Sequence, residues 1–205
     1  VEFELSGINP LAPMALINGH ASYININQAI GIYETINDFD KFPISYRCNA
    51  IDLLSGNEII FKQGSLSKSL RASSSIPSIF SPVKDNELLL VDGGVVNNFP
   101  ADIANRLGAD IIIGVNVAIS KKNMEDINNF VDVLSQSILL NGFKKRLDNL
   151  YYTDVLIEPD VHLQSTLSFE REVLEELYDI GYKAAQNRRD ELIKIKESLK
   201  LDTPT

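Results

Sequence analysis

The segment Leu88–Pro100, LLLVDGGVVNNFP, constrains the fold of this chain more than any other segment. Its apolar run Leu88–Val91 stops at Asp92, and two glycines follow. A continuous apolar run bounded by turn residues is typical of a buried strand. The pattern therefore predicts a strand whose C-terminal end carries one carboxylate. Gly93 and Gly94 allow backbone conformations and close approaches that a side chain would block.

The residues after this strand predict a helix and then a second strand. Pro100 suits the first turn of a helix over Ala101–Leu107, and Gly108 is a natural stop. The apolar run Asp110–Val117 predicts another buried strand. Strand, short helix and strand form a βαβ unit, so we expect the two strands to be parallel neighbours. Ligands bind at the carboxyl ends of strands in open α/β sheets, which makes Asp92 the first catalytic candidate.

The Asp-Gly dipeptide by itself favours an ordinary turn, because both residues are common in turns. The longer run Arg71–Val117 changes this interpretation, because it resembles the C-terminal half of a bacterial patatin-like phospholipase. In that family an Asp-Gly-Gly motif carries the Asp of a Ser-Asp catalytic dyad. The resemblance therefore implies that Asp92 is the catalytic base and that Gly93 and Gly94 support the motif.

The resemblance covers nearly all of the 205 residues. The run Arg71–Pro77 and the Asn-Asn-x-Pro run Asn97–Pro100 fit it, as do Asp38–Ile44 and Asp154–Asp160. It implies an α/β fold of the patatin-like type, with three α/β/α layers and a mainly parallel central sheet that is incomplete in this chain. The implied activity is that of a serine-dependent lipid acyl hydrolase, a phospholipase A or esterase.

The nucleophile of that family lies in a Gly-x-Ser-x-Gly elbow, a strand-to-helix turn that exposes the serine. No such run occurs in this chain, and the family's Gly-rich oxyanion loop is missing from the sequence as well. We therefore expect residues 1–205 to be the C-terminal part of one patatin-like domain whose nucleophile half lies upstream. Residues 199–205 are expected to form a linker to further domains. On this expectation the complete protein is the hydrolase, and the 205-residue chain alone is inactive.

The sequence leaves other functions open beside the Ser-Asp hydrolase. One is a catalytically silent lipid-binding or regulatory module, and another is a triad esterase that uses His162. His162 follows Asp92 in the Ser-Asp-His order of α/β-hydrolases, although the family resembled here uses no histidine. The serines Ser73–Ser75 lack elbow glycines and are expected to satisfy helix-end and turn backbone instead. Two distant histidines and the single Cys48 give no metal-ligand spacing, so no metal or cofactor is expected.

Composition restricts the partners. The formal net charge of −9 argues against a nucleic-acid partner, which requires a basic patch. It does not exclude a lipid or ester substrate, because local basic groups can coexist with a negative net charge. The short cluster Lys144–Arg146 is best interpreted as a solvated helix face, with peripheral contact to lipid headgroups as the functional alternative. The resemblance is compatible with a cytoplasmic or membrane-associated protein.

Further elements follow from periodicity and caps. The predicted helices are Ala21–Thr35, Leu66–Ala72 with a Ser65 or Ser67 cap, Glu125–Leu140 and Phe169–Ser198. The predicted strands are Asp154–Glu158 and a hairpin of Ile44–Leu54 with Glu58–Phe61.

Overall fold

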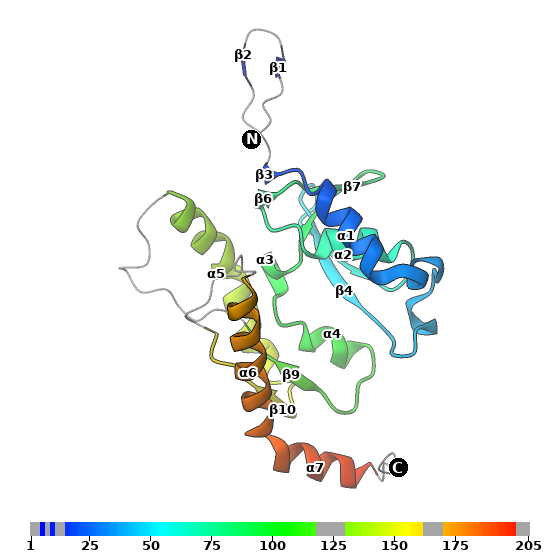
Figure 1. Ribbon diagram of the computed structural model, residues 1–205, viewed down its shortest axis with the longest axis vertical. Helices are drawn as coiled ribbons and strands as arrows, with labels where there is room; N and C mark the ends of the chain where they lie inside the picture. The colour runs from blue at the N-terminus through cyan, green and yellow to red at the C-terminus, as the bar shows by residue number, and fades with distance from the viewer. Residues whose placement is uncertain (1–4, 7–8, 11–14, 118–129, 162–169, 200–205) are drawn as a thin grey trace. The chain divides into compact units, whose positions relative to one another are not determined.

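The computed structural model describes residues 5–6, 9–10, 15–117, 130–161 and 170–199 (Figure 1). It is a mixed α/β structure with seven α-helices among these residues. The chain forms two compact units, Val1–Asn97 and Asn98–Thr205. The mixture of helices and strands predicted from the sequence is confirmed. Residues 200–205 of the expected linker lie outside the described residues.

The first unit is organised around a four-stranded sheet with the order β5-β4-β8-β7. Its strands are β4 (Cys48–Asp52), β5 (Glu58–Phe61), β7 (Val83–Asp85) and β8 (Leu88–Asp92). Each neighbouring pair is antiparallel, so the prediction of a mainly parallel central sheet is wrong. For two of the three pairs the reason is local, because β4 with β5 and β7 with β8 are joined by short turns. A short turn can only return the chain antiparallel, whereas a parallel pair needs a long crossover.

The predicted βαβ pairing is wrong for a related reason. β8 is an inner strand, hydrogen-bonded to β4 on one edge and to β7 on the other. No edge of β8 is left for β9 (Ile113–Val115), the strand that follows it in the chain. β9 instead pairs in parallel with β10 (Val155–Ile157). The two predicted strands therefore exist, but they are not partners.

The sheet of the first unit is covered by α2 (Leu66–Ser73). Ala72 of this helix packs against Ala50 and Leu90 in a core that excludes water, with partly buried apolar side chains around it. The Ser65 hydroxyl accepts the N–H of Lys68 at 3.1 Å, which confirms Ser65 as the N-cap.

The other elements of the first unit lie next to this layer. α1 (His20–Ile30) packs beside α2, and a short 3₁₀ helix, Gly31–Thr35, extends it (Figure 1). The remaining elements are β1 (Leu5–Ser6) paired with β2 (Asn9–Pro10), β3 (Ala15–Ile17) paired in parallel with β6 (Ser78–Phe80), the 3₁₀ helix Phe39–Lys41, and α3 (Gly94–Asn97).

The predicted hairpin of β4 and β5 is confirmed, with residues 53–57 as its loop. Asp52 organises this loop from a buried position, at 2% exposure. Its carboxylate accepts the Ser55 hydroxyl at 2.6 Å and the N–H groups of Leu54, Ser55 and Leu89. The Ser55 hydroxyl and then the Leu89 N–H lower the pKa of Asp52, because they stabilise the charged form.

The second unit combines the parallel β9-β10 pair with α-helices. Its helices are α4 (Ala101–Arg106), α5 (Phe130–Leu150), α6 (Arg171–Gln186) and α7 (Arg189–Ser198). Phe99, Ala101 and Ile112 form its buried cluster. The helix predicted over Ala101–Leu107 is confirmed, and the one predicted over Phe169–Ser198 is two helices. Residues 118–129 and 162–169 lie outside the described residues.

We predict that Asp52→Asn destabilises the protein at neutral pH and lowers its melting temperature by roughly 5 °C. The pKa of Asp52 is lower in the folded state than in the unfolded chain, so its stabilising effect is fully present above the unfolded value of about 4. That effect is lost as the pH falls through the folded value. The gap between wild type and variant, followed by circular dichroism, should therefore narrow below about pH 4.

The matched control is Asp40→Asn, because the Asp40 side chain is 55% exposed in its ion pair with Arg47. Exposed pairs contribute little, so its melting temperature should stay within about 1–2 °C of wild type. A constant gap for Asp52→Asn from about pH 7 down to about pH 2 would contradict the assigned role of the Asp52 carboxylate.

Candidate active site

Asp92 is the last residue of β8, at the point where the sheet gives way to a short helix. It lies opposite Ala50 of β4 in the strand register. The ladder with β7 ends at Leu90, and the N–H of Asp92 donates to the carbonyl oxygen of Ser75 at 3.0 Å instead. The sequence prediction that a strand delivers this carboxylate at its C-terminal end is confirmed.

The Asp92 carboxylate is half-buried and only partly hydrogen-bonded. Its Oδ1 atom accepts the N–H of Gly94 at 2.7 Å, and Oδ2 accepts no hydrogen bond from the residues that the structure describes. Burial raises the pKa of Asp92, and the Gly94 N–H offsets part of this effect. A carboxylate with a raised pKa and one uncommitted oxygen is chemically suited to accept a proton.

A glycine is required at position 93 because the Asn49 side chain lies close to its Cα, and not because of its backbone conformation. Its φ angle is not in the left-handed region, but a Cβ atom would lie 2.6 Å from Nδ2 of Asn49. Asn49 Nδ2 donates to Glu58 at 2.9 Å and to the carbonyl oxygen of Asn97 at 3.1 Å. Asn97 is buried and also donates to Glu58, so the three side chains form one network. Gly94 contributes its backbone N–H to Asp92.

Sequence reasoning missed Asn49 and Glu58, because each lies in a strand without a motif around it. Their relation to Gly93 depends on the register of β4 with β5 and on the turn after β8. Asn97 stands out in the sequence only as part of the Asn-Asn-x-Pro run. A polar residue between the apolar residues Cys48 and Ala50 is the signal that could have indicated Asn49.

The serine run Ser73–Ser75 satisfies backbone and core groups, as predicted. Ser74 Oγ donates to the Leu70 carbonyl at 2.9 Å. Ser75 is fully buried, donates to the Arg71 carbonyl at 2.7 Å and accepts from the Arg71 guanidinium. A fully buried hydroxyl in these bonds is not accessible to an ester.

His162 and Cys48 are the other chemically reactive side chains that bear on the candidate site. His162 lies outside the described residues. Burial raises the pKa of the Cys48 thiol, which keeps it protonated and a poor nucleophile at neutral pH. Within the described ranges, no cluster of three or more His, Cys, Asp or Glu residues is suited to a metal ion.

The basic cluster Lys144–Arg146 is a solvated helix face only in part. Lys145 Nζ forms an ion pair with Asp102 at 2.8 Å, and Arg146 donates to Asn116 at 3.3 Å. Lys144 is exposed. Two of the three cations, Lys145 and Arg146, therefore bond to side chains within the second unit.

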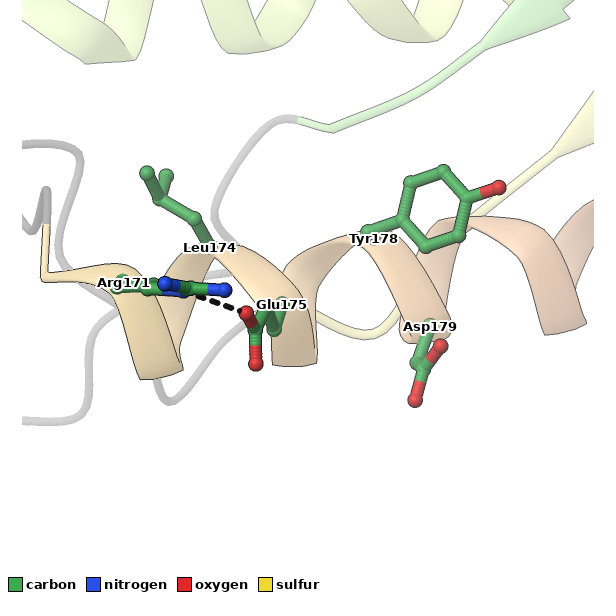
Figure 2. A pocket seen from close by; sticks show the side chains of 5 residues that line it. All are labelled: Arg171, Leu174, Glu175, Tyr178 and Asp179. Carbon is green, nitrogen blue, oxygen red and sulfur yellow. Dashed lines mark hydrogen bonds and ion pairs between the residues drawn. The ribbon is translucent and has the colours of Figure 1, made fainter.

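A shallow depression of about 460 Å³ lies along α6 in the second unit (Figure 2). It is lined by side chains of that helix alone, namely Arg171, Leu174, Glu175, Tyr178 and Asp179. Arg171 and Glu175 are joined by an exposed ion pair at 2.9 Å. Asp92 is not among the lining residues. Among the described helices, none combines the length and the apolar character needed to cross a bilayer.

The region that holds this strand, carboxylate and glycine turn is similar to a known family. Residues 20–105 match the patatin-like phospholipase family. The matched range includes Arg71, Asp92, Gly93 and Gly94, so the resemblance inferred from the sequence is confirmed over this part of the chain. The catalytic role of Asp92 stays a prediction.

Relatives of this patatin-like region are proteins of the NTE family. The chain is 42% identical over 64 residues to an uncharacterized NTE family protein of Mycobacterium tuberculosis, covering 31% of this chain and 11% of that protein. It is 30% identical over 110 residues to a second such protein of that organism, with coverages of 51% and 31%. It is 27% identical over 182 residues to a lysophospholipase of Kluyveromyces lactis, with coverages of 74% and 12%. The chain therefore spans less than a third of the length of these relatives.

We predict that Gly93→Ala destabilises the protein by about 2 kcal/mol, because the added methyl group overlaps the Asn49 side chain. The loss should appear as a melting temperature lower by roughly 5 °C. The measurement is thermal unfolding of wild type, Gly93→Ala, Asn49→Ala and the double variant. Removing Asn49 also removes the overlap, so the double variant should lose less stability than the sum of the single losses.

Gly181→Ala is the control for a glycine without such a neighbour. Gly181 lies inside α6, and a methyl group added there would meet no heavy atom within 4 Å. Helix propensity alone should then stabilise the variant by up to about 1 kcal/mol. Additive losses in the Asn49 and Gly93 series would show that the two residues do not contact each other as described.

Proposed function

We propose that the complete protein is a lipid acyl hydrolase with a Ser-Asp dyad, and that this chain supplies the Asp92 base. Members of the matched family are serine lipid hydrolases. The observation that carries the proposal is the partial burial of the Asp92 carboxylate together with its incomplete hydrogen bonding. It ends a central strand, is half-buried, holds Oδ1 on the Gly94 N–H and leaves Oδ2 without a partner among the described residues.

In the proposed reaction, Oδ2 of Asp92 accepts the proton of a serine hydroxyl from the upstream elbow. The serine oxygen forms a bond to the ester carbonyl carbon, and the carbonyl electrons move to the oxygen. The C–O bond to the alcohol then breaks, and the alcohol takes the proton from Asp92. An acyl-serine remains. Water gives a proton to Asp92 and attacks the acyl carbon, which releases the acid and returns the proton to serine.

The environment of Asp92 suits both halves of this cycle. A fully hydrated carboxylate is a weak base, whereas partial burial raises its pKa and improves proton transfer. The Gly94 N–H fixes the direction of the carboxylate, so Oδ2 keeps one orientation. Stabilisation of the oxyanion would come from the backbone amides of the family's Gly-rich loop.

The family match and the lysophospholipase among the relatives support a lipid ester as the substrate class. We propose an ester of a fatty acid, in a phospholipid or in another lipid ester, reached by peripheral contact with a membrane surface. The reaction described needs no metal or cofactor. A silent lipid-binding module and a triad esterase with His162 are the alternatives that experiment must separate from it.

We predict that Asp92→Asn lowers the ester hydrolysis rate of the full-length protein by about 10³-fold, because the amide cannot accept the serine proton. In the wild type, kcat should fall as the pH drops through the raised pKa of Asp92. The acidic limb of the profile therefore lies above the ordinary aspartate value of about 4. Release of fatty acid from lysophospholipid vesicles, measured from about pH 4 to about pH 9, checks both expectations.

His162→Gln in the same full-length protein separates the dyad from the triad. The dyad predicts a rate within about twofold of wild type, whereas loss of a triad histidine would cost on the order of 10³-fold. Labelling with a fluorophosphonate tests for the serine. A protein that binds the vesicles but neither turns over nor labels would be the silent module, and the proposal would be wrong.

We also predict that the purified 205-residue chain hydrolyses no ester above the buffer rate, since it contains no Gly-x-Ser-x-Gly elbow. The assay is release of p-nitrophenol from a short-chain p-nitrophenyl ester by the chain and by its Asp92→Asn variant. Turnover by the chain that the variant abolishes would place a nucleophile within residues 1–205.

A further inference from the structure

Arg71, in the last turn of α2, is a buried cation whose surface is only 5% exposed. Its partners are all neutral: Ser75 Oγ, the carbonyl oxygens of Gly19 at 3.4 Å and Ser81 at 3.0 Å, and the Phe80 ring at 5.3 Å. Among the described residues it contacts no carboxylate. Burial therefore lowers the pKa of Arg71. A buried charge without an opposite charge costs free energy, so its position requires an explanation.

The guanidinium joins three segments that are far apart in the sequence. Gly19 precedes α1 with φ of +82°, and a Cβ atom there would lie 2.6 Å from Cζ of Arg71. Ser81 follows β6, and its N–H donates to Ile17 of β3 at 3.0 Å. A planar fork with five N–H donors can bind several acceptors at fixed angles, which a lysine ammonium cannot do.

The third acceptor, Ser75, connects Arg71 to the proposed base. Its hydroxyl bonds to the Arg71 guanidinium and to the Arg71 carbonyl, and the residue is fully buried. Its own carbonyl oxygen accepts the N–H of Asp92 at 3.0 Å, beyond the last residue that β7 pairs. Ser75 thus links the Arg71 guanidinium to the backbone of Asp92, through its hydroxyl on one side and its carbonyl oxygen on the other.

We propose that Arg71 is a positioning residue for Asp92 and acts on it through Ser75. The proposal rests on the function of Asp92 proposed above. By fixing Ser75 in the core, Arg71 fixes the Asp92 peptide at the end of β8 that β7 does not pair. The carboxylate then keeps its half-buried place beside the Gly94 N–H.

The test is Arg71→Lys in the full-length protein, which keeps the charge but not the fork. We expect a folded protein by circular dichroism, with kcat on p-nitrophenyl butyrate about tenfold to a hundredfold lower and KM within about twofold. The pKa of Asp92, followed by ¹³C NMR of the carboxyl groups and assigned with Asp92→Asn, should move down toward its ordinary value. The acidic limb of kcat should move to lower pH with it, because the loosened carboxylate becomes more hydrated.

Lys68→Met is the matched control on the same helix. Lys68 forms an ion pair with Asp85 at 2.8 Å, and its side chain is 41% exposed. This variant should leave kcat and the pKa of Asp92 unchanged. Ser75→Ala is the second variant, because it removes the hydroxyl link and keeps the Ser75 carbonyl and Arg71. It should shift kcat and the pKa of Asp92 in the same direction as Arg71→Lys, and it decides the question if Arg71→Lys does not fold.

Folded variants with the wild-type pKa of Asp92 would overturn the proposal, even where kcat falls, since Arg71 would then act by another route. The NMR titration requires no turnover, so it separates this inference from the proposed function. If the wild type hydrolyses no ester, or if Asp92→Asn retains full activity, the proposed function fails. The titration still reports whether Arg71 controls the environment of the Asp92 carboxylate.

Discussion

The inner position of β8 is the constraint on which the first unit depends. Both of its edges are hydrogen-bonded, to β7 on one side and to β4 on the other. Two residues beyond Leu90 the pairing with β7 has ended, and the N–H of Asp92 bonds to Ser75. Most of β8 is thus held by regular strand pairing. On the β7 side, however, its last residue is held by one hydrogen bond to Ser75, in the turn after α2. The carboxylate therefore stands at the place where regular pairing gives way to side-chain networks.

β4 secures its neighbour β8 with polar groups near both ends. Asp52 accepts the Leu89 N–H near the start of β8, and Asn49 packs against Gly93 just after its end. Such groups have geometric requirements that apolar packing does not have. A one-residue slip of β8 would separate both of them from their partners and would turn its apolar side chains to the other face. The polar residues of β4 therefore fix the register, and the register fixes the height of Asp92 in the sheet.

Local signals in the sequence were enough for the elements but not for their pairing. The apolar run before Asp92, the Ser65 cap and the turn between β4 and β5 each lie within a few residues, and all three are present. The parallel sheet was wrong because strand partners depend on which edges are already occupied, and β8 has none free. Arg71 could not be recognised either. A basic residue in the last turn of a helix is normally solvated and favoured by the helix dipole, whereas here it is buried among neutral acceptors.

Two carboxylates of the same sheet show how one fold produces opposite chemistry. Asp52 is surrounded by donors, from the Ser55 hydroxyl and three N–H groups, and these hydrogen bonds lower its pKa. Asp92 is also partly removed from water but receives one N–H, so burial prevails and its pKa rises. A carboxylate that serves structure gains from every donor around it, whereas a base must keep one oxygen uncommitted. The balance between donors and burial distinguishes Asp92 from Asp52 as the candidate base, because donors dominate at Asp52 and burial dominates at Asp92.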